Sequence, residues 1–205
     1  SANFEEGDSL SAPTQDAHRN RYDVILTNPP FGPLPYDPSG VFEYPARLFE
    51  AVFLQHMMNS LKPGGRCATV MKEGLLFSNS PHSLVNIRRR LLDEFNVIGV
   101  VSLPSGVFLP YTGSKTSILV FQKPRDALAP RTKEVWFYRI ENDGFELGAT
   151  RRPLSEAAAR GEMMGDLPDC FARFKKRGES ERSWLVPAET ISGSDYNLTA
   201  GRYSP

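Results

Sequence analysis

The sequence has few of the features that define several large classes of protein. Among its 205 residues are two cysteines, Cys67 and Cys170, too few for a disulfide framework and consistent with a reducing compartment. No apolar run approaches the roughly 20 residues that span a bilayer. The N-terminus has no basic segment followed by an apolar block, the pattern of a secretory signal. We therefore expect a cytoplasmic protein with no membrane partner.

An excess of charge of one sign and a cluster of metal ligands are also lacking. Lysine plus arginine and aspartate plus glutamate each total 24, which argues against a protein that holds nucleic acid through total charge but does not exclude DNA. The run Arg88-Arg89-Arg90 is typical of a solvated helix face, with phosphate contact as the alternative. His18, His56 and His82 show no ligand spacing, so the sequence predicts no metal site.

The first part of the chain alternates between strand and helix patterns. Residues 22–27 form an apolar run with β-branched residues, ended by two prolines that cannot continue a ladder, which predicts a buried strand. Helical spacing of apolar residues over 46–61 predicts a helix, and the Lys-Pro-Gly-Gly segment at 62–65 supplies its stop. A second strand is expected at 67–71. A second helix follows, with Ser80 as N-cap and Pro81 at its first position.

Two more strands are separated by a short connection. Residues 97–103 and 116–121 are joined by a loop rich in Pro and Gly that is too short for a crossover helix, so we expect an antiparallel pair. Further elements are predicted as an edge strand at 134–140, a helix near 166–176 and an apolar stretch at 184–186.

This order predicts an α/β fold with a parallel sheet that ends in an antiparallel hairpin. Residues 1–141 hold the sheet, and residues 142–205, which are polar and punctuated by Gly and Pro, form a small C-terminal extension. Ligands of such sheets gather at the carboxyl ends of the strands. The turn Asn28-Pro29-Pro30-Phe31 lies at the carboxyl end of the first strand.

The chemistry of this turn suits an exocyclic amine. Pro29 and Pro30 fix the backbone and remove two donors, which leaves the carbonyls of Asn28 and Pro29 as rigid acceptors beside the Asn28 side-chain oxygen. Two acceptors can take both N–H groups of an amine and orient it to attack an electrophilic methyl group, while Phe31 offers a face for a planar ring. A turn with no function is the alternative, because Asn-Pro commonly initiates turns.

The segment Asp23-Val-Ile-Leu-Thr-Asn-Pro-Pro-Phe-Gly32 resembles the catalytic motif of amino-group methyltransferases that use S-adenosylmethionine. More specific matches are Leu61-Lys-Pro-Gly-Gly-Arg66, Leu103-Pro-Ser-Gly-Val-Phe-Leu-Pro-Tyr-Thr-Gly-Ser-Lys-Thr116, Glu181-Arg-Ser-Trp-Leu-Val186 and Asp195-Tyr-Asn-Leu198. Together they resemble the modification subunit of type I restriction-modification systems, in the N6-adenine DNA methylase family. The resemblance covers nearly the whole chain and implies a Rossmann-like methyltransferase sheet.

By this resemblance, the enzyme flips an adenine out of double-stranded DNA and holds it at Asn28, Pro29 and Phe31. Phe108 or Tyr111, in the loop 104–114, completes the base pocket from the other side; packing of Phe108 beneath the loop is the alternative. The resemblance also implies S-adenosyl-L-methionine as cofactor. A specificity subunit and a restriction subunit are the implied partners, and residues 142–205 are a candidate subunit-contact region.

The glycine-rich cofactor loop that precedes the turn in this family has no counterpart here. We therefore expect a fragment that begins just before the catalytic motif, forms the C-terminal half of the catalytic domain and is inactive alone. Glu6-Gly-Asp-Ser-Leu10 resembles the stretch before the catalytic strand, which makes Asp8 a cofactor candidate beside Asn28; a capped surface loop is the alternative. Two other functions remain open, an amino-group methyltransferase for RNA or protein and a non-catalytic methyltransferase-like scaffold.

Overall fold

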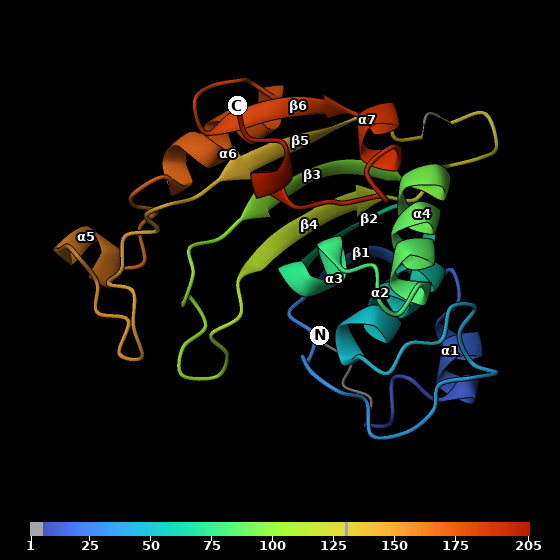
Figure 1. The fold of residues 1–205 in the computed structure, drawn as a ribbon. Coiled ribbons are helices and arrows are strands. Elements are labelled where there is room, and N and C mark those ends of the chain that lie inside the picture. The colour runs from blue at the N-terminus through green and yellow to red at the C-terminus, as the bar shows by residue number, and fades with distance from the viewer. Residues whose placement is uncertain (1–5, 130) are drawn as a thin grey trace.

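The structure is a computed structural model that describes residues 6–129 and 131–205. A six-stranded mixed sheet in the order β1-β2-β4-β3-β5-β6 forms its centre (Figure 1). The strands are β1 (Tyr22–Thr27), β2 (Leu61–Lys72), β3 (Asn96–Ser102), β4 (Thr116–Gln122), β5 (Glu134–Arg139) and β6 (Ser183–Pro187). Helices accompany the sheet, and the predicted α/β class is confirmed.

The strand directions place four carboxyl ends at one edge of the sheet. β1 pairs in parallel with β2, and β3 pairs in parallel with β5. β4 is antiparallel to both β2 and β3, so β1, β2, β3 and β5 all run in the same direction. The antiparallel pairing of β3 with β4 is confirmed, but β4 lies inside the sheet because both of its edges are hydrogen-bonded. The edge position predicted for 134–140 is wrong, because β6 pairs with β5 on its outer side.

Helices cover the two faces of the sheet unequally (Figure 1). The helices are α1 (Ala12–His18), α2 (Phe49–Ser60), α3 (Glu73–Phe77), α4 (Ser83–Glu94), α5 (Glu156–Ala159), α6 (Leu167–Lys176), α7 (Ala188–Ser192) and a 3-10 turn (Ala200–Arg202). Alternation along β5 separates the two cores: Val135 and Phe137 join the main cluster with α2, α4 and α7, whereas Trp136 and Tyr138 pack with Cys170 of α6. β6 belongs to residues 142–205, so this stretch is continuous with the sheet.

Two helices begin later than the sequence predicts. The predicted start at residue 46 becomes Phe49, because Leu48 is extended and bridges to Pro33. The prediction of Ser80 as N-cap with Pro81 at the first helical position is wrong, because α4 begins at Ser83 with His82 as its N-cap. Ser80 belongs to the preceding loop, where its carbonyl accepts a hydrogen bond of 2.9 Å from the Ser78 hydroxyl.

β2 begins six residues before the predicted strand at 67–71, directly after the last residue of α2. The Lys-Pro-Gly-Gly segment does follow the end of the helix, but it also pairs in the sheet. The Gly64 amide donates to the Lys123 carbonyl at 2.9 Å, and the Lys123 amide donates to the Gly65 carbonyl at 2.8 Å. This segment therefore extends β2 alongside the chain that leaves β4.

The prediction of a buried strand at 22–27 is wrong, because one face of β1 has little cover. Val24 and Leu26 are 50% and 76% exposed, whereas Ile25, which points to the opposite face, packs against the main core. An apolar parallel strand with one bare face is unusual, because parallel sheets are normally covered on both sides. Within residues 6–129 and 131–205, no helix has the length and apolar character needed to cross a membrane.

A buried histidine beneath β1 makes the stability of the chain dependent on pH. His56 is 9% exposed, and burial, followed by the neighbouring His18, lowers its pKa to about 4. The unfolded chain, with a histidine pKa of about 6.5, binds more protons between these two values, so stability is lost as the pH falls from about 6.5 towards 4. Urea unfolding should give roughly 2 kcal/mol less stability from His56 at pH 5 than at pH 7.5. His56→Gln should remove this part of the pH dependence and His82→Gln, on an exposed histidine, should not; equal slopes in both variants would contradict the assignment.

Candidate active site

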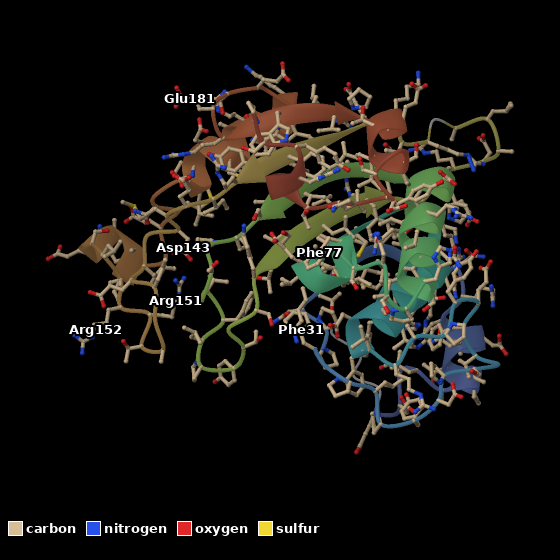
Figure 2. All side chains as sticks on the ribbon, viewed as in Figure 1. Phe31, Phe77, Asp143, Arg151, Arg152 and Glu181 are labelled. Carbon is tan, nitrogen blue, oxygen red and sulfur yellow. The ribbon has the colours of Figure 1, made fainter. Side chains whose placement is uncertain are left out.

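Residues from three connections meet at the edge of the sheet where the parallel strands end. Asn28 follows β1, Lys72 ends β2, and the loop 103–115 connects β3 to β4. Phe31 lies near the loop between β3 and β4 (Figure 2). A cavity of about 520 Å³ opens between them and is lined by Asn28, Pro29, Pro30, Phe31, Lys72, Phe108, Tyr111 and Thr112. The structure thus brings the predicted catalytic turn and both predicted base-pocket aromatics to one cavity.

The turn is held from behind by the start of α2. The Gly32 amide donates to a carboxylate oxygen of Glu50 at 2.9 Å, and the Gly32 carbonyl accepts from the Phe49 amide at 2.9 Å. Glu50 is 3% exposed, so this contact is shielded from water. Gly32 has φ of +111°, a conformation that a residue with a Cβ rarely adopts. The backbone of Asn28 to Phe31 is therefore fixed by two prolines on one side and by α2 on the other.

The oxygens at this turn are available as hydrogen-bond acceptors. Pro29 and Pro30 lack amide hydrogens, so the carbonyls of Asn28 and Pro29 face no competing donor from within the turn. Pro29 is buried, whereas Asn28 is exposed at the cavity. Phe31 is half-buried and adds an aromatic wall. A planar molecule that carries an amine matches this combination of acceptors and ring.

The loop opposite the turn presents its two aromatics in different ways. The Thr112 amide donates to the Phe108 carbonyl at 3.1 Å, which holds both aromatics in one short turn. Phe108 is partly buried against the second core cluster, as the packing alternative predicts, and it lines the cavity as well. Tyr111 is 92% exposed. Phe108 thus forms a packed wall of the cavity, whereas Tyr111 lies at its exposed rim.

Lys72 is a residue of this cavity that the sequence reasoning missed. It is half-buried, pairs in register with Thr116 of β4, and its ammonium nitrogen lies 5.6 Å from the centre of the Phe31 ring. The signal was available, because Lys72 directly follows the predicted strand 67–71 at the edge where ligands gather. The same reasoning that singled out Asn28 after the first strand could have singled out Lys72 after the second.

Glu73, the next residue, ties this edge of the sheet together. One of its carboxylate oxygens accepts hydrogen bonds from the hydroxyls of Ser102 at 2.9 Å and Ser117 at 3.0 Å. The Lys115 ammonium lies 3.7 Å from the same oxygen. Glu73 thereby links the ends of β2, β3 and β4 beneath the cavity, and its charge is already neutralised by Lys115.

Asp8 does not line this cavity. It is exposed, and its carboxylate accepts a hydrogen bond of 2.9 Å from the Leu10 amide, the contact expected of a capped surface loop. Its role towards a cofactor therefore stays a prediction. In the part of the chain that the structure describes, no group of three His, Cys, Asp or Glu side chains is arranged to hold a metal ion.

The sheet, with a cavity at the carboxyl ends of its parallel strands, places the chain in the class of Rossmann-like α/β domains. Within this class, the chain belongs to the N-6 DNA methylase family, whose sequence model matches residues 1–205. The family resemblance predicted from the motifs is confirmed.

Individual relatives agree with this family. The methylase subunit of the type I restriction enzyme EcoEI from Escherichia coli is 36% identical over 184 residues, which cover 86% of this chain and 35% of that protein. The EcoKI methylase subunit from Escherichia coli K12 is 32% identical over 191 residues, which cover 88% of this chain and 35% of that one. A type I restriction-modification methyltransferase subunit from Streptococcus thermophilus superposes with a TM-score of 0.73 at 26% identity, over 97% of this chain and 41% of that one. The chain spans about a third of the length of the curated relatives.

Proposed function

We propose that the intact protein containing this chain is a site-specific DNA adenine-N6 methyltransferase subunit of a type I restriction-modification system. One observation carries the proposal: the Asn28-Pro29-Pro30-Phe31 turn and the loop that holds Phe108 line one cavity of about 520 Å³. This volume falls in the range of small-molecule sites and suits a single base. Membership of the N-6 DNA methylase family favours adenine over other amines.

In this proposal the residues of the chain bind and orient the base. The amine of a flipped adenine donates its two N–H bonds to the Asn28 side-chain oxygen and to a backbone carbonyl of Asn28 or Pro29, which aims the nitrogen lone pair out of the turn. Phe31 and Phe108 supply aromatic walls for the purine. S-adenosyl-L-methionine, when bound, supplies the electrophilic methyl group. No strong base is needed, because the amine nitrogen loses its proton during or after transfer.

The C-terminal stretch is the proposed contact region for partner subunits. An arm at residues 141–165 carries α5 and projects from the sheet, with Arg152 on its outside (Figure 2). Leu147, Leu154 and Met163 on this arm are 57%, 55% and 52% exposed, so the arm offers apolar side chains for contact with a partner. The specificity and restriction subunits are the proposed partners, because the relatives belong to type I restriction enzymes.

Labelled methyl transfer tests the proposed function directly. The full-length protein, assembled with its partners, should incorporate methyl groups from S-adenosylmethionine into unmethylated DNA, and digestion of the DNA to nucleosides should yield N6-methyl-2′-deoxyadenosine. Ribosomal RNA and a release factor serve as controls for RNA and protein amines. Incorporation into either control but not into DNA would replace the proposed substrate. No incorporation into any of the three would favour the scaffold function.

We further expect this chain alone to bind S-adenosylmethionine weakly. The chain spans about a third of its curated relatives, and its sequence has no counterpart of the glycine-rich cofactor loop that the family resemblance implies. Calorimetric titration should give a dissociation constant at least tenfold higher for residues 1–205 than for the full-length protein. Equal affinity for the two would contradict this expectation.

A further inference from the structure

The ammonium group of Lys72 has no function in the proposed reaction as described so far. It lines the cavity beside Asn28 and Phe31, and it contacts the Phe31 ring at 5.6 Å from its centre. Among the described residues, no carboxylate forms an ion pair with it. Glu73, the adjacent acid, is bonded to Ser102, Ser117 and Lys115 instead. The cavity thus contains a cation with three hydrogen-bond donors and no anion of its own.

The chemistry of the other lining groups indicates what this cation meets. The remaining lining residues are prolines, aromatics, Asn28 and Thr112, and none carries a negative charge. In the proposed complex the oxygens of the turn are occupied by the amine of the ligand. That amine is the donor group of adenine, and it is flanked by two acceptors, N1 on the same ring carbon and N7 on the adjoining ring. These ring nitrogens are left for donors elsewhere in the cavity, where Tyr111 and Thr112 offer neutral hydroxyls and Lys72 the charged donor.

We propose that the Lys72 ammonium donates a hydrogen bond to one of the two ring nitrogens that flank the amine of the bound adenine, and so acts as a specificity-determining residue. This inference rests on the proposed function. The ammonium lies over the Phe31 ring, 5.6 Å from its centre, so a base that stacks on Phe31 comes within reach of it, and the flexible four-carbon stem of lysine lets the ammonium move to the edge of the base. The acceptors of the turn and the donor of Lys72 together match the pattern of adenine. Guanine has a carbonyl in place of the amine, so it offers the turn an acceptor where adenine offers a donor, although its N7 could still accept from Lys72.

The proposal makes Lys72 a positioning group with little part in the chemical step. A donor at a ring nitrogen withdraws density from the purine and does not assist attack by the amine. Its removal should therefore raise KM for DNA more than it lowers kcat, because binding is weakened similarly in the ground state and in the transition state.

A chemical double-mutant cycle in the full-length protein tests the proposal. The probes are duplexes whose target base is adenine, 1-deazaadenine or 7-deazaadenine, in which a C–H group replaces N1 or N7 while the amine is retained. With the wild-type protein, one of the two analogues should lower kcat/KM for methyl transfer by roughly tenfold or more, as expected for a hydrogen bond to a charged group. Lys72→Met should show the same loss on adenine and no further loss on that analogue.

Two variants keep the test specific. Lys72→Arg retains a charged donor and should still distinguish the analogue from adenine. Lys62→Met, at the opposite end of the same strand and bonded to Asp23 at 2.8 Å, should behave like the wild type on all three duplexes. If Lys72→Met lowers transfer equally on all three duplexes and flattens the salt dependence, the ammonium binds a phosphate and the proposal is overturned. Absence of transfer by the wild type to any duplex would instead overturn the proposed function, together with this inference.

Discussion

Replacing Asn28 by alanine is expected to lower methyl transfer by the full-length protein about a hundred- to thousand-fold. The change removes the side-chain acceptor that orients the amine in the proposed complex, which leaves only backbone carbonyls to do so. Asn28 is exposed at the cavity, so its truncation removes little packing and the fold should be retained. Labelled methyl incorporation into DNA at saturating cofactor measures the loss, and thermal unfolding checks that the protein is folded.

Two further variants separate chemistry from assembly. Asn28→Asp keeps an acceptor oxygen at the same place and should retain more activity than the alanine variant. Asn86→Ala, on α4 and outside the residues that line the cavity, should leave transfer unchanged. A scaffold would keep its biological activity when Asn28 is replaced. Full methylation by Asn28→Ala would therefore show that the turn does not hold the base.

The location of the site could be predicted from the sequence because it follows from strand direction. Residues after parallel strands meet at one edge of the sheet, and both the turn at Asn28 and the loop with Phe108 follow such strands. The effect of a proline on the backbone and of an aromatic ring on stacking depends little on distant residues. The sequence alone could therefore suggest an acceptor turn and a base pocket. The direction of the strands was therefore enough to place the turn and the loop at the same end of the sheet.

Other features depend on contacts between distant segments and had no local signal. The short connection between β3 and β4 predicts that these two strands pair. It does not show that β4 also pairs with β2, which places β4 between β2 and β3. Glu50 reads as an ordinary polar residue on a helix, yet it binds the Gly32 amide 18 residues earlier. Neither the pairing of β4 with β2 nor the contact of Glu50 with Gly32 can be predicted from the local sequence, because the partners become neighbours only after folding.

Arg88 is the clearest case, because the run Arg88-Arg89-Arg90 predicted a solvated face or a phosphate contact. Arg88 is instead completely buried. All its N–H groups donate within the protein: one to the Tyr196 carbonyl, two to the carbonyls of Leu75 and Ser78, and two to the Asn79 side chain and the Asp195 carbonyl, at 2.7–3.0 Å. Burial lowers its pKa to about 10, which still leaves the guanidinium charged at neutral pH. One side chain thus joins α4, the loop after α3 and the C-terminal segment.

Arg88→Met is therefore expected to lower the free energy of unfolding by about 3–5 kcal/mol, because it leaves several buried carbonyls without a donor. Lysine should restore little of this, because three donors on a flexible stem cannot reproduce the five fixed donors of the guanidinium. Arg89→Met is the matched control: Arg89 is exposed and lies over the Tyr196 ring at 5.4 Å, so less than about 1 kcal/mol should be lost. Urea unfolding of the three variants measures these differences, and equal stability of Arg88→Met and Arg89→Met would contradict the role of Arg88. Because the carbonyls of Asp195 and Tyr196 lose their donor in this variant, Arg88→Met should also increase proteolytic cleavage near Asp195 before the sheet unfolds.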